Sequence, residues 1–383
     1  MRRDRAARVR GHIVFKGLFF CLLLLFLAAC EAKDPAAGQM TPATATATQG
    51  GNGSAFQLPA QGQQGATPRP QATTAAARTG AGINSNRPVL AFFYPWYTSS
   101  SWCSCRMSDL PPVQYNSSDD ATIAWQVNQA AGAGITGFIS SWWGAGTQTD
   151  HNFAKLLSFS AALEQQTRYH FASTIYFESD APALRGTTNM INALSYVAAH
   201  YSSDPHFFRW QGKPVIFFWN PLGNGRSLSQ WAAIRAQVDP QHRFIWSAEG
   251  TNLVSLDVFD GIHLFSAAYW GVVHGTINAV DRNFRNQITA YNNAHHTQKI
   301  WAAGVFPGFD DSRMPNRPTH VVVARNNGAT YRASWNGALS SSPDWVTVTS
   351  FNEWFEGSMI EPAVHYGDQY LQITGQYARQ WHG

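Results

Sequence analysis

Short apolar runs alternate with amphipathic stretches along most of the chain. Eight of these runs are rich in β-branched and aromatic residues and are bounded by turn-forming residues. Most are continuously apolar, as expected of strands that are buried on both faces of a parallel sheet. The predicted strands are Val89–Tyr97, Ile135–Trp143, Phe171–Glu178, Pro214–Trp219, Arg243–Ala248, Gly261–Ser266, Ile300–Phe306 and Trp345–Phe351.

Helix-like segments separate these strands. Eight strands that alternate with helices in about 300 residues predict a single (β/α)8 barrel of the TIM type. A doubly wound open sheet is the alternative, because a count of strands does not show that the sheet closes. The predicted helices are Asp120–Ala131, Asn152–Glu164, Asn189–His200, Leu228–Val238, Ile277–Ala294 and Tyr331–Leu339.

One glycine motif in the chain has the spacing of a dinucleotide-binding loop. Gly132, Gly134 and Gly137 match G-x-G-x-x-G. In dinucleotide-binding proteins the glycines follow a strand and open a helix, so that the helix N-terminus faces the pyrophosphate. Here they lie between a predicted helix and the next strand. We therefore interpret them as the end of a helix and the start of a strand, and predict no nucleotide site.

The N-terminal residues 1–30 are typical of a bacterial lipoprotein signal. Six cations against Asp4 give this segment a charge of +5, which leaves −1 for the rest of a chain whose net charge is +4. The basic pI is therefore no sign of nucleic-acid binding. An apolar run too short for a bilayer-spanning helix of about 20 residues ends in Leu27-Ala28-Ala29-Cys30, which resembles a lipobox. We expect an exported protein, lipid-anchored to a bacterial membrane through Cys30; an ordinary cleaved signal peptide is the alternative.

Composition divides the rest of the chain into two parts. Residues 31–86 are rich in Ala, Thr, Gln, Gly and Pro and cannot bury enough apolar surface to fold, which predicts a disordered linker. All 15 tryptophans lie after residue 86, which predicts one large domain over 87–383. Its cysteines, Cys103 and Cys105, either form a local disulfide or stay unpaired, and no second pair completes a zinc site.

Aromatic and acidic residues gather where the predicted strands end, which is the active-site end of a (β/α)8 barrel. Aromatic faces stack on the C–H faces of sugars, and carboxylates accept hydrogen bonds from hydroxyl groups. Ordinary packing is the alternative for each aromatic ring, and loop capping or cation binding for the aspartates. The candidates are Tyr94, Trp96, Tyr97, Trp142, Trp143, Glu178, Glu249, Asp310, Asp311, Asn352, Trp354 and Glu361.

Glu353 and Glu356 indicate a reaction type. Glycosidic hydrolysis usually needs one protonated carboxyl group and one ionised carboxylate. Two carboxyl groups held close together cannot both ionise freely, so their pKa values separate and their roles divide. The apolar residues around the pair, Phe351, Trp354 and Phe355, do not fit the solvated helix face on which E-x-x-E spacing is common. No H-E-x-x-H, G-x-S-x-G or P-loop motif points to another chemistry.

Three segments of the chain resemble glycoside hydrolase family 99, endo-acting α-mannosidases built on a (β/α)8 barrel. They are Tyr94–Tyr97, Gly304–Arg313 and Ser350–Pro362, and the third is the most specific. The resemblance adds Arg313 to the substrate-binding candidates. It implies that Glu356 is the catalytic acid/base and that Glu353 takes the proton of the sugar 2-hydroxyl. That hydroxyl then forms a 1,2-anhydro sugar, which water opens with net retention.

The resemblance implies no metal and no organic cofactor, and it implies a polysaccharide or oligosaccharide substrate. Judged from the residues alone, a nucleophile role for Glu353 is equally open. Phe355 stands where the family usually has His, Ser358-Met359 replace Thr-Gln, and Phe218-Trp219-Asn220 replace a polar stretch. We therefore expect substrate contacts that differ from those of the family. A related barrel acting on another α-glycan, and a non-catalytic carbohydrate-binding lipoprotein, are the alternatives.

The lipoprotein hypothesis predicts that Cys30→Ala releases the protein from the membrane, because the thiol that carries the lipid is lost. Globomycin should likewise block processing of the wild-type chain. Fractionation of cells that express each form measures both effects. A wild-type product that is freely soluble contradicts the hypothesis.

Overall fold

The computed structural model describes residues 87–268, 277–315, 317 and 319–383. The predicted signal 1–30, with Cys30, and the predicted linker 31–86 lie outside the described residues. No helix in the described ranges combines the length and the apolar character that a membrane span requires.

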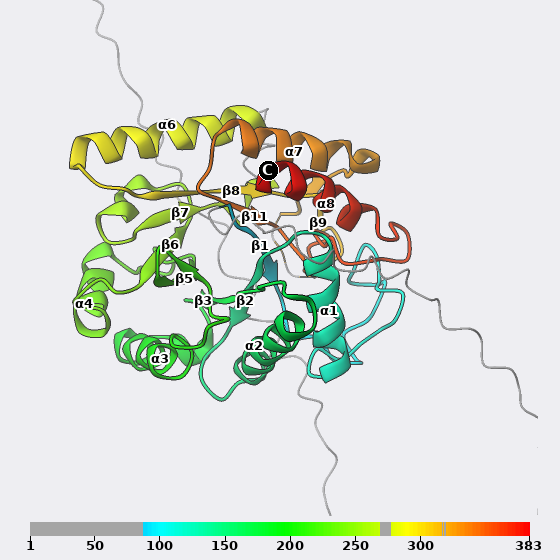
Figure 1. Ribbon diagram of the computed structural model, residues 1–383, viewed down its shortest axis with the longest axis horizontal. Coiled ribbons are helices and arrows are strands. Elements are labelled where there is room, and N and C mark those ends of the chain that lie inside the picture. The colour runs from blue at the N-terminus through cyan, green and yellow to red at the C-terminus, as the bar shows by residue number, and fades with distance from the viewer. Residues whose placement is uncertain (1–86, 269–276, 316, 318) are drawn as a thin grey trace, which may run out of the picture.

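Eight parallel strands form a closed barrel (Figure 1). Each strand pairs with the next along the chain, and closure comes from the last strand, which pairs with the first through Val89 and Val346. The (β/α)8 prediction is therefore confirmed, and the open-sheet alternative is wrong. The strands are β1 (Val89–Phe93), β2 (Gly137–Trp142), β3 (Thr174–Glu178), β5 (Lys213–Trp219), β6 (Ile245–Glu249), β7 (Gly261–His263), β8 (Ile300–Val305) and β11 (Trp345–Val348).

Helices cover the outside of the barrel (Figure 1). They are α1 (Asp120–Gly132), α2 (Gln148–Thr167), α3 (Thr187–His200), α4 (Leu228–Val238), α6 (Ile277–His295), α7 (Ala329–Ser340) and α8 (Gln369–His382). The connection between β6 and β7 contains a short 3₁₀ turn, η3 (Leu253–Asp257). The remaining short elements are the 3₁₀ turns η2 (Pro182–Leu184) and η4 (Asn326–Gly328) and the strands β4 (Arg209–Trp210), β9 (Phe309–Asp310) and β10 (Val322–Val323).

The sequence prediction finds all eight barrel strands and six of these helices but misses α8. In α8 a glycine, Gly375, interrupts the apolar positions, and glycine is a poor helix former. Packing of Tyr370, Leu371 and Trp381 against the rest of the domain stabilises the helix. Tertiary burial thus outweighs a weak local preference.

Alternate residues of each strand enter two different cores. Leu90 and Phe92 of β1 lie in a cluster that takes side chains from strands all round the sheet, so this cluster fills the barrel. Val89, Ala91 and Phe93 join a second cluster that includes the helices and therefore lies between the barrel and its outer layer. This alternation decides which side chains reach the mouth of the barrel.

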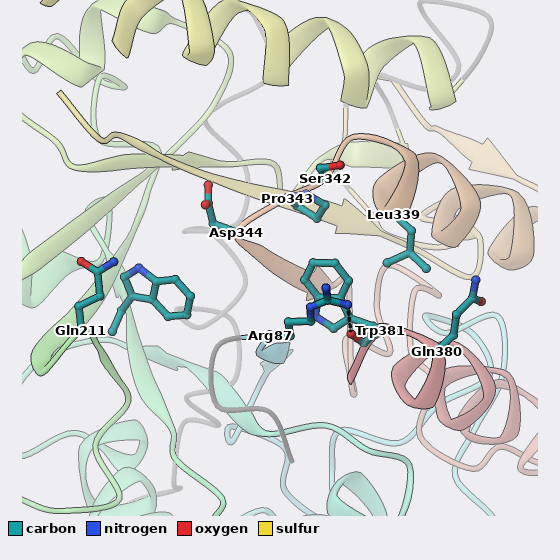
Figure 2. Close-up of a pocket in the computed structure, with 9 residues that line it drawn as sticks. Arg87, Gln211, Leu339, Ser342, Pro343, Asp344, Gln380 and Trp381 are labelled. Carbon is teal, nitrogen blue, oxygen red and sulfur yellow. Dashed lines mark hydrogen bonds between the residues drawn. The ribbon is translucent and has the colours of Figure 1, made fainter. Parts of the chain in front are cut away.

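A cavity of about 600 Å³ lies at the N-terminal end of the strands (Figure 2). Its lining includes Arg87, which precedes β1, and Asp344, which precedes β11. Trp381 of α8 and Trp210 of β4 complete its aromatic surface. The cavity is therefore at the opposite end of the barrel from the strand ends that carry the predicted site.

The glycine motif is placed as predicted. Helix α1 ends at Gly132, and strand β2 begins at Gly137. A Cβ atom on Gly137 meets the carbonyl oxygen of Ala172 at 1.7 Å, so the backbone of the next connection leaves no room for a side chain. The residue is required for close approach of two backbones rather than for binding a phosphate.

Gly137→Ala is therefore expected to lower the free energy of unfolding by about 1–3 kcal/mol or more, because neither backbone can move without breaking sheet pairing. Gly375→Ala is the matched control. Its nearest neighbour is the flexible end of Arg379 at 3.3 Å, so this change is expected to be neutral or stabilising by up to about 1 kcal/mol. Urea unfolding measures both, and equal effects contradict the assignment.

Candidate active site

The predicted catalytic loop follows β11 and folds back on itself. Two backbone hydrogen bonds close it, from Ser350 N to Ser358 O at 2.9 Å and from Glu361 N to Phe351 O at 2.8 Å. A third, from Phe351 N to the carbonyl oxygen of Phe92, joins the loop to β1 at 2.8 Å. The loop is thus fixed to two adjacent strands at their C-terminal ends, and it carries Glu353 and Glu356.

Glu353 is buried and receives two hydrogen bonds. The hydroxyl of Tyr97 donates to its Oε1 at 3.3 Å, and the backbone N–H of Phe355 donates to the same oxygen at 3.1 Å. Its own N–H donates to Ser350 Oγ at 2.7 Å. The Tyr97 hydroxyl also accepts from the backbone N–H of Trp354 at 3.0 Å. These contacts hold the carboxyl group in one direction.

Glu356 is buried beside a cation. Its Oε1 accepts a hydrogen bond from the guanidinium of Arg317, which also pairs with the fully buried Asp311. Its Oε2 has no hydrogen-bond partner within the described part of the chain. A buried carboxyl oxygen without a partner is costly unless it is protonated or meets a ligand. One oxygen of Glu356 is therefore held in an ion pair, and the other is available for chemistry.

Burial raises the pKa of both glutamates. Loss of solvation is the largest cause for Glu353, and the negative charge of Glu356 adds to it. Burial is also the largest cause for Glu356, but the positive charge of Arg317 opposes part of the rise. Two buried carboxyl groups that repel each other favour a state in which one is protonated and the other is ionised. The site therefore provides an acid and a base together.

Glu361, five positions after Glu356, is a supporting residue. Its carboxylate accepts hydrogen bonds from Gln126 Nε2 at 2.7 Å, Tyr115 Oη at 2.8 Å and Trp354 Nε1 at 3.0 Å. It is 2% exposed, and burial raises its pKa to about 7. With three protein donors already bound, this carboxylate anchors the catalytic loop. The contacts of Glu361 thus favour loop anchoring over the substrate contact that the sequence predicts.

Asn352 and Trp354 are also structural. The side-chain amide of Asn352 accepts from Tyr94 N at 2.7 Å and donates to Tyr94 O at 3.1 Å, so it continues the pairing between loop and strand. Both residues are fully buried. Their polar atoms are used inside the protein, which favours a structural role over the predicted contact with a sugar.

Aromatic side chains lie beside Glu353 and form one side of the site. Tyr94 lies against Trp96 with ring centres 4.7 Å apart, and Trp96 meets Trp143 edge to face at 5.8 Å. Tyr97 lies 5.6 Å from Phe355. Trp96, Trp143 and Phe355 are partly exposed, so their rings are open to a sugar, whereas Tyr94 and Tyr97 are buried.

Glu178 and Glu249 reach the mouth of the barrel from β3 and β6. Ser141 donates to Glu178 at 2.7 Å, and burial, with a contribution from the charge of Glu356, raises the pKa of Glu178 to about 8. Burial also raises the pKa of Glu249 to about 8, although a backbone hydrogen bond from Ser266 opposes it. Both remain candidates for substrate contacts.

Two other candidates make their contacts away from Glu353 and Glu356. Trp142 is fully buried and donates from Nε1 to Asp150 of α2 at 2.9 Å, so it belongs to the outer core. Strand alternation gives the reason, because Trp142 faces the opposite side of β2 from Trp143. Arg313 donates to the carbonyl oxygens of Ser104 and Met107, both at 2.8 Å. For Trp142 these contacts favour a role in the core, and for Arg313 they favour a role in fixing the loop after β1.

The aspartates after β8 stabilise their own loop. Asp310 accepts hydrogen bonds from Ser312 N at 3.1 Å and Ser312 Oγ at 2.6 Å, which is the capping role left open by the sequence. Asp311 accepts from the N–H of Val321 at 2.7 Å besides its pair with Arg317. The contacts of Asp311 therefore favour a role in positioning Arg317.

Several contributors to the site are absent from the sequence prediction. Arg317 lies in a loop, and its distance from Glu356 along the chain hides the ion pair. Tyr115 joins Glu361 and Trp354 from the loop after β1. Trp219, at the end of β5, is partly exposed and packs against Phe265 at 5.3 Å. Because Trp219 lies at the end of a predicted strand, the sequence alone could have indicated it as a residue of the site.

The loop after β1 carries a disulfide between Cys103 and Cys105, which settles the alternative that the sequence left open. The neighbouring Arg106 lies over the ring of Phe355 at 5.9 Å. This loop therefore lies beside Phe355, the residue that stands where the family usually has His.

Comparison with known proteins agrees with this geometry. The sequence profile described as glycosyl hydrolase family 99 matches residues 107–374. The chain belongs to glycosyl hydrolase family 99. It is therefore a glycoside hydrolase.

Individual family 99 relatives are distant in sequence. The chain is 23% identical to the glycoprotein endo-α-1,2-mannosidase of Mus musculus over 339 residues, which cover 78% of this chain and 71% of that protein. It is 23% identical to the enzyme of the same name from Rattus norvegicus, covering 70% of this chain and 62% of that one. Their similarity supports an endo-acting enzyme in this family.

A solved family 99 structure has the same fold. The endo-α-mannosidase of Bacteroides thetaiotaomicron superposes with a TM-score of 0.64 at 21% identity, covering 78% of this chain and 98% of that chain. The barrel is thus shared, although four of five residues in the alignment differ.

Glu361→Gln tests the anchoring role in this family 99 chain. Either orientation of the glutamine amide turns an N–H toward a buried donor, so we expect the free energy of unfolding to fall by about 1–3 kcal/mol. Asp310→Asn, in a locally capped turn, is the control and is expected to change stability by less than about 0.5 kcal/mol. Urea unfolding measures both. Unchanged stability of Glu361→Gln with weaker substrate binding contradicts anchoring and favours a substrate contact.

Proposed function

We propose that this protein is a retaining, endo-acting α-mannosidase that cleaves mannan or mannose-containing glycans through a 1,2-anhydro sugar. The names of its relatives support α-mannosidic substrates. The same proposal includes export and anchoring of the domain to the outer face of a bacterial membrane through Cys30. One observation carries the enzymatic part: two buried, mutually repelling glutamates at the mouth of the barrel, one of them with an unpartnered oxygen.

In the first step, Glu356 is the acid and Glu353 is the base. The proton on Oε2 of Glu356 passes to the glycosidic oxygen as the bond from C1 to that oxygen breaks. Glu353 takes the proton of the 2-hydroxyl, whose oxygen bonds to C1 and gives the 1,2-anhydro sugar. In the second step Glu356 takes a proton from water, whose oxygen bonds to C1 as the bond from C1 to O2 breaks, and Glu353 returns its proton to O2.

Individual contacts of the two glutamates support this division of roles, although the charge of Arg317 also favours the ionised form of Glu356, so the bound substrate has to favour the proton on Glu356. Tyr97 and the backbone N–H of Phe355 both donate to Glu353, and donors stabilise the ionised form that a base requires. Arg317 occupies only Oε1 of Glu356, so Oε2 is left to carry the proton. By stabilising the carboxylate that remains after transfer, Arg317 makes Glu356 a stronger acid.

Mannose suits this route because its axial 2-hydroxyl lies opposite an α leaving group, and no enzyme nucleophile is then needed. The partly exposed rings of Trp96, Trp143 and Phe355 provide faces for the neighbouring sugars. Phe355 stands where the family usually has His, so this side chain can stack on a sugar but cannot form a hydrogen bond with it.

Replacement of each glutamate by glutamine tests the proposal. Glu356→Gln and Glu353→Gln should each lower kcat on α-mannan oligosaccharides by about 10²–10⁴-fold and leave glycan binding intact, because proton transfer is lost while shape is kept. Asp257→Asn, an exposed carboxylate bonded to Tyr291, is the control. Mass spectrometry of the products identifies the bond that is cleaved.

Other outcomes distinguish the alternatives. Cleavage of defined α-glucan oligosaccharides in place of α-mannan contradicts the proposed substrate and favours a related α-glycan hydrolase. A wild-type protein that binds glycans but cleaves none of a broad panel contradicts the enzymatic proposal and favours a carbohydrate-binding module.

Arg317→Gln tests the electrostatic role of the ion pair. Arg317 lowers the pKa of Glu356, so its removal raises that pKa. Because Glu356 must be protonated to act as the acid, the alkaline limb of kcat/KM against pH should move to higher pH, while kcat falls for substrates with poor leaving groups. An alkaline limb that stays in place or moves to lower pH contradicts this role.

A further inference from the structure

A second cluster of polar side chains lies at the other end of the barrel. Glu164 is in the last turns of α2, His170 is in the connection from α2 to β3, and His206 precedes β4. In a (β/α)8 barrel such helix-to-strand connections lie at the N-terminal ends of the strands, away from the catalytic face. Among the residues that the structure describes, this is the group of three side chains with metal-ligand spacing.

Both imidazole rings converge on one carboxylate oxygen. His206 Nε2 lies 2.8 Å from Glu164 Oε2, and His170 Nδ1 lies 3.0 Å from the same atom. All three ligand atoms are within 4.8 Å of one another. Tetrahedral zinc, with bonds of about 2.0–2.2 Å to nitrogen and oxygen, separates its ligand atoms by about 3.3 Å. The two distances to Glu164 are already close to this spacing, and movement of the exposed side chains of Glu164 and His170 would bring the two ring nitrogens to it.

The buried histidine is held in place by its surroundings. The side chain of His206 is 10% exposed, and its backbone carbonyl accepts from Ser173 N at 2.8 Å. The carboxylate of Asp204 accepts from His206 N at 2.7 Å and lies 3.5 Å from Nδ1 of the ring. Metal-binding histidines commonly have a carboxylate at the second ring nitrogen, which fixes the tautomer and the ring direction.

The nitrogen of His206 that faces Glu164 is also the one that a metal ion would use. Nε2 lies 2.8 Å from Glu164 Oε2, so either a proton on Nε2 or a cation bound by both atoms lies between them. Glu164 and His170 have side-chain exposures of 39% and 54%, so an ion and a water ligand can enter from solvent.

We propose that Glu164, His170 and His206 bind one Zn²⁺ ion, with water as the fourth ligand. Two imidazoles and one carboxylate are a ligand set that zinc accepts readily and that magnesium and calcium do not favour. The ion joins the end of α2 to the connections that lead into β3 and β4. The site is structural and independent of the glycosidase reaction.

Isothermal titration of the untagged, EDTA-treated protein with ZnCl₂ tests the site. We expect one ion per chain, a rise in Tm with Zn²⁺, and no comparable effect of Mg²⁺. His206→Ala and His170→Ala should weaken binding by more than about 100-fold, and Asp204→Asn by about 10–100-fold, the loss typical of an outer-shell residue. His200→Ala, an exposed histidine that contacts Tyr196 of its own helix, is the control and should bind as the wild type does.

His170 is exposed, so its variant is expected to fold even if His206→Ala does not. Circular dichroism and hydrolysis of the substrate verify that each variant is folded. Absence of Zn²⁺ binding to the wild type, or binding that survives His170→Ala in a folded protein, overturns the proposal and leaves the cluster as an ordinary ion pair. Neither result affects the proposed glycosidase function, because the two sites share no residue.

Discussion

Burial of two carboxyl groups beside each other is the constraint on which the rest of the active site depends. Glu353 and Glu356 lose their solvation, and they repel each other when both are ionised. The protein compensates with donors to Glu353 and with Arg317 beside Glu356. Asp311 in turn holds Arg317. A network of buried charges thus replaces the water that the glutamates have lost.

The loop that carries the pair is rigid for the same reason. Glu361 accepts hydrogen bonds from three buried donors, and the side chain of Asn352 joins the loop to Tyr94, just after β1. These residues support the loop that carries Glu353 and Glu356. The three glutamates of this short segment therefore divide into two proposed reacting groups and one anchor, which also binds Trp354.

Much of this could be predicted from the sequence. Apolar runs of strand length reveal the barrel because parallel strands are buried on both faces, and the loop after β11 carries a recognisable motif. The pairing of Arg317 with Glu356 could not be found, because it joins residues 39 positions apart through a loop without periodicity. Trp142 shows the opposite case: its position near a strand end suggests the site, but its side chain is buried in the outer core, whereas the partly exposed Trp143 contacts Trp96.

The central claim is that Glu356 and the substrate's own 2-hydroxyl together cleave an α-mannosidic bond with retention. The most direct measurement is the anomeric configuration of the first product, followed by ¹H NMR during hydrolysis of an α-mannan oligosaccharide before mutarotation. The account predicts that the new reducing end appears first as the α-anomer. A β-anomer as the first product shows single-step inversion and contradicts the account.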